Sequence, residues 1–181
     1  MPKFDIKNLY YITHIENISS ILQEGILSHG QVEKQQIQFT PIYDNEIVNK
    51  RQNKATPDRQ SLWNYANLYF QPRNPMMYRV VHEKTHNNIA IISVKPNLLS
   101  VSDIKITDGN TANNTTQFYS LPQGKKVLQK NWKIIQNEWW NDSDGSKRII
   151  MSECLVPEKV NPNLIESIYV SNYDTQKKSK K

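Results

Sequence analysis

The chain has 181 residues, of which 37% are hydrophobic and 22% charged, and this composition is typical of one globular domain rather than a disordered or fibrous chain. No apolar run reaches the roughly 20 residues that cross a bilayer, so we expect no membrane partner. Residues 1–5 lack the apolar stretch of a secretory signal, and the single cysteine, Cys154, excludes an internal disulfide. We therefore expect a cytoplasmic location. The net charge of +6 does not establish a nucleic-acid partner, because four lysines lie in residues 177–181 and the remainder has 19 basic against 17 acidic residues; we expect one domain over residues 1–173 and a basic tail over 174–181.

The first elements follow from changes in apolar spacing. Residues Leu9–His14 are rich in aromatic and β-branched types and predict a strand. Helical spacing then begins at Ile18, and Gly25 is placed to end that helix. The polar stretch Gln31–Lys54 predicts a long loop.

A second helix is predicted from Thr56 to Tyr69. Thr56, Pro57 and Asp58 combine a capping hydroxyl, a first-turn proline and an acid at the positive end of the helix dipole. Helical spacing follows for Leu62, Tyr65, Ala66 and Tyr69. Pro72 is expected to stop the helix.

Two strands are predicted next, over Met76–His82 and Ile89–Val94, joined by the polar turn Glu83–Asn88. Residues 82–86 spell H-E-x-x-H, a zinc motif when it lies on a helix. In a hairpin the two histidines diverge, and no later histidine supplies a third ligand. We therefore predict an exposed turn and no metal site.

Towards the end of the chain, helical spacing relates Leu128, Trp132, Ile135 and Trp139. Strands are predicted over Arg148–Val156 and Leu164–Val170. Several strands with helices gathered early favour the α+β class over alternating β/α units.

Glu153 is the residue that most needs an explanation. Alternation places it on the same strand face as Met151 and Leu155, and a carboxylate in apolar surroundings loses hydration unless a partner holds it. Either it pairs with a lysine or arginine at a strand edge, or it is catalytic. Its neighbour Cys154 points the other way and is expected in the core. The five glycines form no G-x-G-x-x-G or Walker loop, so nucleotide binding would need another design.

The amino-acid sequence resembles those of the DarT family, the DNA-modifying toxins of DarT–DarG toxin–antitoxin systems. The similarity covers nearly the whole chain in order, and its segments are Leu9–Ile18, Ile21–Gly25, Tyr65–Phe70 running into Pro72–Tyr78, Thr107–Asn110, Phe118-Tyr119 and Ser152–Pro157. The stretch from Tyr65 to Tyr78 is the most specific of these.

The resemblance implies the ADP-ribosyltransferase fold, with a split, mainly antiparallel sheet and NAD, the co-substrate, in its cleft. It implies Glu153 as the catalytic glutamate and residues 105–147 as the segment that presents the target. NAD contacts would come from Thr13, His14, Ile15, Leu22 and Arg51. Without the resemblance, His14 is better explained as a cap of the next helix, and Arg51 as a solvated charge.

The family assigns to Arg51 the removal of a proton from the base, but guanidinium is essentially never deprotonated in water. We expect Arg51 to grip the NAD phosphates or polarise the base.

Unpaired bases are expected to stack on exposed aromatic side chains. The expected nucleic-acid contacts are Tyr69, Arg73, Met76, Met77, Tyr78 and Trp132. For Trp132, a place in the core is an equally good explanation.

We therefore expect a toxin that transfers ADP-ribose from NAD to a base, thymidine, in single-stranded DNA, with a macrodomain antitoxin of DarG type as partner. Two alternatives remain open. In the first alternative, the protein is the same kind of transferase but its acceptor is RNA or protein. In the second, the chain is a non-catalytic module that only binds single-stranded nucleic acid.

Overall fold

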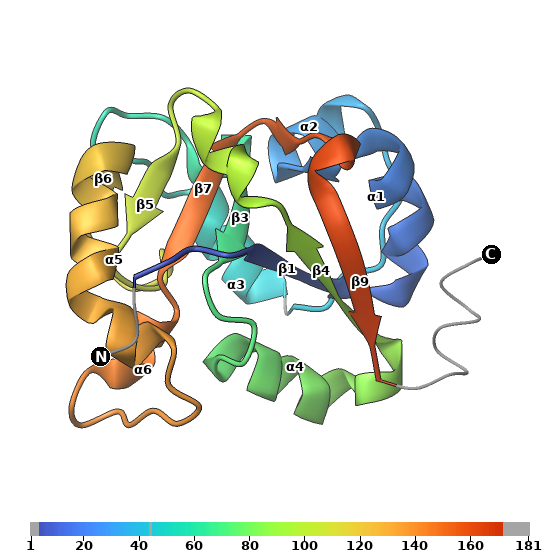
Figure 1. Cartoon of the computed structure of the whole chain (residues 1–181). Helices are drawn as coiled ribbons and strands as arrows, with labels where there is room; N and C mark the ends of the chain where they lie inside the picture. The colour runs from blue at the N-terminus through green and yellow to red at the C-terminus, as the bar shows by residue number, and fades with distance from the viewer. Residues whose placement is uncertain (1–3, 44, 172–181) are drawn as a thin grey trace.

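The computed structural model describes residues 4–43 and 45–171, and its largest element is an antiparallel sheet of seven strands in the order β6-β5-β7-β3-β1-β4-β9 (Figure 1). These strands are β1 Leu9–His14, β3 Tyr65–Tyr69, β4 Ile89–Val94, β5 Lys105–Thr107, β6 Phe118–Ser120, β7 Glu153–Pro157 and β9 Ile165–Val170. A separate two-stranded sheet pairs β2 Ile26–Leu27 with β8 Lys159–Val160.

The α-helices are α1 Ile18–Glu24, α2 His29–Lys34, α3 Asn45–Gln52, α4 Pro75–Lys84, α5 Leu121–Ile135 and α6 Ser146–Ile150. Short 3-10 helices are η1 Ile15–Asn17, η2 Leu62–Asn64, η3 His86–Asn88, η4 Pro96–Ser100 and η5 Pro162–Leu164. Figure 1 places α5 and α6 at one end of the sheet and α1 and α2 at the other. Across residues 4–43 and 45–171, every helix is too short or too polar to traverse a bilayer.

The large sheet divides between β3 and β1. These strands share the single register pair Tyr10↔Tyr69, whereas β1 and β4 pair from Leu9↔Val94 to His14↔Ile89. The sheet therefore opens into the halves β6-β5-β7-β3 and β1-β4-β9. This is the split antiparallel architecture of the α+β class that the sequence predicted.

The main core lies between the sheet and α5. Helix α5 presents Leu128, Trp132 and Ile135 inward, and Gly124 lets its backbone approach Ile106 of β5, because a Cβ there would collide with that side chain. The Trp132 ring packs edge-on against Phe4 at 5.1 Å between centroids and is 7% exposed. Trp132 is thus a core residue, and the prediction that it contacts nucleic acid is wrong.

The N-terminal predictions are largely confirmed. The strand Leu9–His14 and the helix before Gly25 form as expected. Gly25 has φ +94°, and its N–H donates to the Ile21 carbonyl at 2.9 Å. The long loop is only partly correct, because α2 and α3 occupy much of residues 31–54.

The predicted helix Thr56–Tyr69 is wrong. Thr56 begins a tight turn in which its hydroxyl donates to Asp58 at 2.6 Å and its N–H donates to the Gln60 carbonyl. Residues Tyr65–Tyr69 then form β3, which pairs with β7 on one side. The side chains of this central strand are buried on both faces, so burial in the sheet overrides the helical spacing.

The predicted strand Met76–His82 is also wrong, because α4 forms there. Asn74 caps it by accepting from the Met77 N–H at 3.0 Å, and Pro75 takes the first turn, where proline is favoured. The helix ends before Thr85, which has φ +69°. His82 therefore lies on the helix and His86 beyond it, and no metal-binding group of three His, Cys, Asp or Glu side chains occurs in the described part of the chain.

The predicted strand Arg148–Val156 begins later than expected. Residues Ser146–Ile150 form α6, and β7 starts at Glu153. Helix α5 ends at Ile135, so Trp139 lies outside it and is 79% exposed. The last strand, Ile165–Val170, is confirmed within one residue.

Candidate active site

Glu153 stands at the first position of β7 with its side chain fully buried. Its carboxylate is held from two directions. Arg51 Nη1 lies 3.4 Å from Oε1, and the Thr111 N–H donates to Oε2 at 3.3 Å. The Glu153 N–H in turn donates to Thr107 Oγ1 at 2.9 Å. The carboxylate is thus fixed at the buried start of an inner strand rather than paired at the surface.

Arg51 reaches Glu153 from the last turn of α3, 102 residues earlier in the chain. Its side chain is 12% exposed. The second guanidinium nitrogen, Nη2, is buried and has no hydrogen-bond partner among the described residues. A buried unpaired donor is costly, so this nitrogen is well suited to donate to an anionic or carbonyl oxygen of a ligand.

Three tyrosines surround this ion pair. Burial raises the pKa of Tyr69, and the Glu153 carboxylate raises it further. Burial likewise raises the pKa of Tyr43 and of Tyr11, against the opposing effect of Arg51. All three phenols therefore stay protonated and act as neutral donors around the charged pair.

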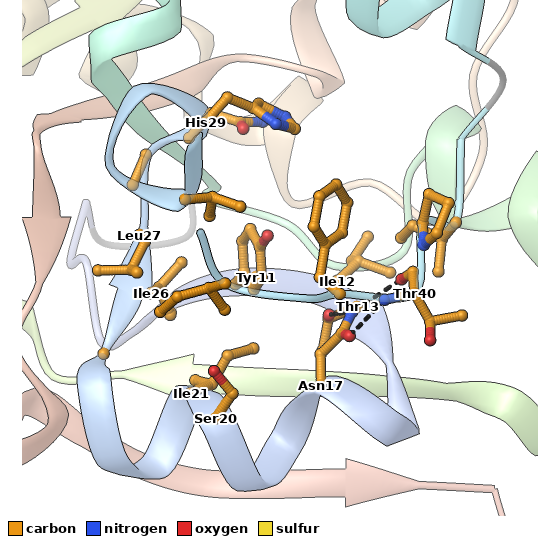
Figure 2. Close-up of a pocket in the computed structure, with 18 of the residues that line it drawn as sticks. Tyr11, Ile12, Thr13, Asn17, Ser20, Ile21, Ile26, Leu27, His29 and Thr40 are labelled. Carbon is orange, nitrogen blue, oxygen red and sulfur yellow. Dashed lines mark hydrogen bonds between the residues drawn. The ribbon is translucent and has the colours of Figure 1, made fainter. Parts of the chain in front are cut away.

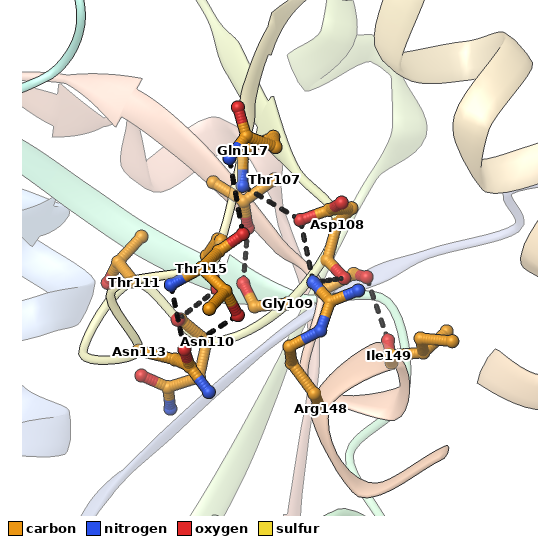
Figure 3. Close-up of polar contacts among 12 residues, drawn as sticks. Thr107, Asp108, Gly109, Asn110, Thr111, Asn113, Thr115, Gln117, Arg148 and Ile149 are labelled. Atoms are coloured by element: carbon orange, nitrogen blue, oxygen red, sulfur yellow. Dashed lines mark hydrogen bonds and ion pairs between the residues drawn. The ribbon is translucent and has the colours of Figure 1, made fainter. Parts of the chain in front are cut away.

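The segment from β5 to β6 folds into a tied loop beside Glu153 (Figure 3). Arg148 Nη1 donates to both the carbonyl and the carboxylate of Asp108, each at 2.8 Å. Asp108 also accepts from the Gln117 N–H at 2.9 Å, and Thr116 Oγ1 donates to the Asn110 carbonyl at 2.7 Å. These bonds hold the backbone at Thr111 in place to donate to Glu153.

A small cavity lies between β1, α1 and the segment before α3 (Figure 2). Thr13 lines it, and Asn17 fixes its rim. The Asn17 amide donates to Thr13 Oγ1 at 3.1 Å and to the Thr40 carbonyl at 2.8 Å, while its oxygen accepts from the Thr40 N–H at 2.8 Å. The cavity thus presents hydroxyl and amide groups beside apolar side chains.

The other residues expected at NAD lie around this cavity without lining it. His14 Nδ1 accepts from the Glu16 N–H at 3.2 Å, so His14 caps η1. Ile15 is buried, and Leu22 is 48% exposed on α1. Of the four side chains expected here, only Thr13 faces the cavity in the described structure.

His29 stands where this cavity meets a much larger groove, since it lines both. Its ring stacks on Trp63 at 4.4 Å between centroids. Burial, and then the charge of Arg51, lower the pKa of His29 to about 4. The imidazole is therefore neutral at pH 7. Its position as the first residue of α2 could not be anticipated, because the sequence predicted no helix there.

The groove has a volume of about 1450 Å³, larger than the roughly 300–1,000 Å³ of a typical small-molecule pocket. Arg51 lines it, and so do five of the six residues predicted to contact nucleic acid, namely Tyr69, Arg73, Met76, Met77 and Tyr78. Trp139 and Trp140 face them, with the Tyr78 and Trp140 rings 6.2 Å apart. An exposed aromatic wall beside a buried ion pair fits a polymer with flat bases.

The comparisons with known proteins agree with this geometry. The family model "ssDNA thymidine ADP-ribosyltransferase, DarT" matches residues 10–181. The fold is that of an ADP-ribosyltransferase. The chain belongs to the DarT family.

Two curated relatives extend the likeness over the whole chain. A DNA ADP-ribosyl transferase–DNA ADP-ribosyl glycohydrolase fusion protein of Thermosipho africanus (strain H17ap60334) is 48% identical over 182 residues, covering 99% of this chain and 46% of the relative. A DNA ADP-ribosyl transferase of Thermus sp. (strain 2.9) is 27% identical, over 90% of this chain and 80% of the relative. The chain thus spans about half the length of the Thermosipho relative.

Solved structures give the same result. Thermosipho africanus DarTG in complex with ADP-ribose superposes with a TM-score of 0.87 at 45% identity, over 96% of this chain and 46% of that one. Thermus sp. 2.9 DarT in complex with ADP-ribosylated ssDNA gives 0.82 at 23% identity, over 95% and 85%. The second likeness concerns the fold alone.

Proposed function

We propose that the protein transfers ADP-ribose from NAD to thymidine in single-stranded DNA and releases nicotinamide. The observation that carries this proposal is the Glu153 carboxylate, buried and held by Arg51 and Thr111 behind a groove with an aromatic wall. Family membership supplies the reaction class, and the site supplies groups of the kind that this reaction needs.

The reaction breaks the bond between nicotinamide and the ribose anomeric carbon, and that carbon then bonds to the base. Positive charge builds on the sugar as nicotinamide leaves, as in glycoside cleavage. A fixed carboxylate near that charge stabilises the transition state more than the ground state. Glu153 has this role, and its existing partners hold it in place before the substrate binds.

The base loses one proton when the new bond forms, and this proton is released to solvent. Arg51 does not take that proton, because guanidinium stays protonated at any ordinary pH. Its unpaired Nη2 instead binds a diphosphate oxygen of NAD or polarises a carbonyl of the base. Arg51 thus contributes to both NAD binding and catalysis through its charge.

One part of NAD enters the small cavity beside β1, and the rest of the molecule lies in the large groove beside Arg51. Thr13 contacts the part in the cavity directly. His14, Ile15 and Leu22 lie beside the cavity and contact the part of NAD outside it. In His14 the accepting role of Nδ1 leaves Nε2 as the donor available to a ribose hydroxyl.

The acceptor strand lies in the groove, where Tyr78 and Trp139 are 60% and 79% exposed and offer faces for stacking. A single strand suits this groove, because a paired base would first have to be flipped out at a cost of a few kcal/mol. The description of the family model, an ssDNA thymidine ADP-ribosyltransferase, supports this choice over RNA or protein.

A macrodomain antitoxin of DarG type is the proposed protein partner. Support comes from the Thermosipho relative, whose name joins a transferase and a glycohydrolase in one chain. The cytoplasm, where NAD and DNA meet, is the proposed location. We infer that residues 1–173 form one domain. The basic tail 174–181 lies outside the described residues.

The test is incubation of the protein with NAD and single-stranded oligonucleotides of varied sequence, followed by mass spectrometry. We expect a product heavier by one ADP-ribose only where thymidine is present. Modification of RNA or protein in place of DNA would contradict the acceptor. Tight DNA binding without any transfer would favour a non-catalytic binding module.

A further inference from the structure

Lys54 closes a ring of contacts around the Glu153 carboxylate. Its N–H donates to the Arg51 carbonyl at 3.1 Å. Its ammonium group donates to the carbonyls of Thr111 at 3.1 Å and Ala112 at 2.6 Å. Arg51 and Thr111 each hold one carboxylate oxygen of Glu153.

Arg51 and Thr111, which hold the Glu153 carboxylate, belong to segments far apart in the sequence. Arg51 is in the last turn of α3, and Thr111 is in the tied loop between β5 and β6. Lys54 joins them across 57 residues of sequence. Its backbone is itself fixed, since the Leu62 N–H donates to its carbonyl at 2.9 Å. The lysine therefore has a rigid base from which to reach the loop.

Placing an ammonium group here has a cost. Burial lowers the pKa of Lys54, and the positive charges of Arg51 and Lys50 lower it further. A lysine that served only solubility would extend away from these cations into water. Its contacts with two carbonyl oxygens offset the cost and point to a role in the loop.

We propose that Lys54 is a positioning residue for catalysis: it locks the loop carrying Thr111 to the helix carrying Arg51, and so fixes the Glu153 carboxylate between them. This inference rests on the proposed function of Glu153. Lys54 itself touches neither NAD nor the base, and it does not line the groove or the cavity.

Losing the lock frees Thr111 to move away from Oε2. A shift of about 1 Å in a catalytic group is enough to cost on the order of 100-fold in rate. Because the NAD-binding cavity is formed elsewhere, by β1 and α1, the loss is expected in kcat and not in the KM for NAD.

The experiment measures kcat and KM of the full chain with NAD and thymidine-containing single-stranded DNA, for wild type, Lys54→Met and Lys54→Arg. We expect Lys54→Met to lose on the order of 100-fold in kcat with little change in the KM for NAD. Arginine keeps a cation with several donors, so Lys54→Arg is expected to recover most of the rate. Should Lys54→Met fail to fold, Lys54→Gln, which is too short to reach both carbonyls, replaces it with the same expectation.

Lys95→Met is the matched control. The Lys95 ammonium also donates to a backbone carbonyl of a distant segment, that of Asn163 at 3.3 Å, but it lies away from the site. Its kcat is expected to equal that of the wild type. A wild-type kcat in Lys54→Met, or a loss confined to the KM for NAD, would overturn the inference. An inactive wild type would instead overturn the proposed function.

Discussion

At the scale of the residue, the contacts of Glu153 explain why a carboxylate is tolerated at the buried start of β7, an inner strand of the sheet. The side chain is fully buried, and an unpaired charge in that place would cost several kcal/mol or shift to its neutral form. The Arg51 guanidinium, the Thr111 N–H and the Tyr69 hydroxyl supply the compensation. The same contacts that make burial possible also fix the direction of the carboxylate.

Glu153→Gln is the sharpest substitution at this position, because it keeps the size of the side chain and removes its charge. We expect the rate of transfer to fall on the order of 100- to 1000-fold, with NAD binding retained. Single-turnover transfer to labelled DNA, with NAD affinity measured by calorimetry, checks both parts.

Glu166→Gln serves as its control. The Glu166 carboxylate accepts from the Asn8 amide at 2.7 Å on the exposed edge strand β9, and its loss should leave the rate unchanged. A near wild-type rate in Glu153→Gln would remove Glu153 from the mechanism.

At the scale of the element, the groove depends on α4 and on the segment after α5. Tyr78 on α4 faces Trp140 across the groove, and Arg73 pairs with Glu138 at 3.0 Å. Because both members of that ion pair are exposed, it contributes little stability. The aromatic faces are the more important feature for holding DNA.

Tyr78→Ala and Trp139→Ala are each expected to weaken DNA binding by about 1–3 kcal/mol, the value of one stacked base. The KM for DNA should rise accordingly, and kcat at saturating DNA should stay near the wild-type value. Tyr169→Ala is the control, since Tyr169 is 53% exposed on β9 outside the groove. Equal effects at Tyr169 and Trp139 would argue against a specific stacking surface.

The element scale also shows where prediction from sequence fails. The strand β1 was predictable because its residue types and spacing agree. Residues Tyr65–Tyr69 have helical spacing, yet they form a central strand whose two faces are both covered. For α4 the decisive signal was the Asn74-Pro75 cap, and the run of β-branched residues within it suggested a strand instead.

The residues of the candidate site also differ in how far they could be predicted from the sequence. Glu153 was predictable because a lone carboxylate in an apolar stretch needs a partner, and the family resemblance named it. The partners were harder to find, since Thr111 contributes only its backbone N–H and Lys54 is one of many lysines. Their roles arise when the fold brings segments 42 and 57 residues apart into contact.

At the scale of the whole molecule, the end of α1 packs against the small sheet at Gly25. Gly25 has φ +94°, and a Cβ there would collide with the Val160 carbonyl of β8. Substitution at this position therefore affects both the end of α1 and the pairing of β2 with β8. A shift of the end of α1 that relieved the collision would also move β2 relative to β8.

Gly25→Ala is expected to lower the free energy of unfolding by about 1–3 kcal/mol, the range for strained backbone positions, with the collision adding to it. Gly145→Ala is the matched control, because Gly145 has φ +75° but open space around its Cβ position. Denaturant unfolding of both variants checks the difference. Equal losses would mean that the contact with Val160 carries no energy.

The cavity proposed for NAD and the groove proposed for DNA share lining residues, and the sheet that carries them is split between β3 and β1. His29 and Tyr43 line both spaces, and Arg51 lies on the groove side next to Glu153. The dinucleotide and the strand are thus expected to meet at this boundary.

A crystal structure of the protein with a non-hydrolysable NAD analogue tests this account most directly. The account predicts the Glu153 carboxylate within hydrogen-bond distance, about 2.6–3.2 Å, of a hydroxyl on the nicotinamide ribose. It also predicts that Arg51 faces the diphosphate or the groove. A nicotinamide ribose bound away from Glu153, with the carboxylate still enclosed by Arg51 and Thr111, would contradict it.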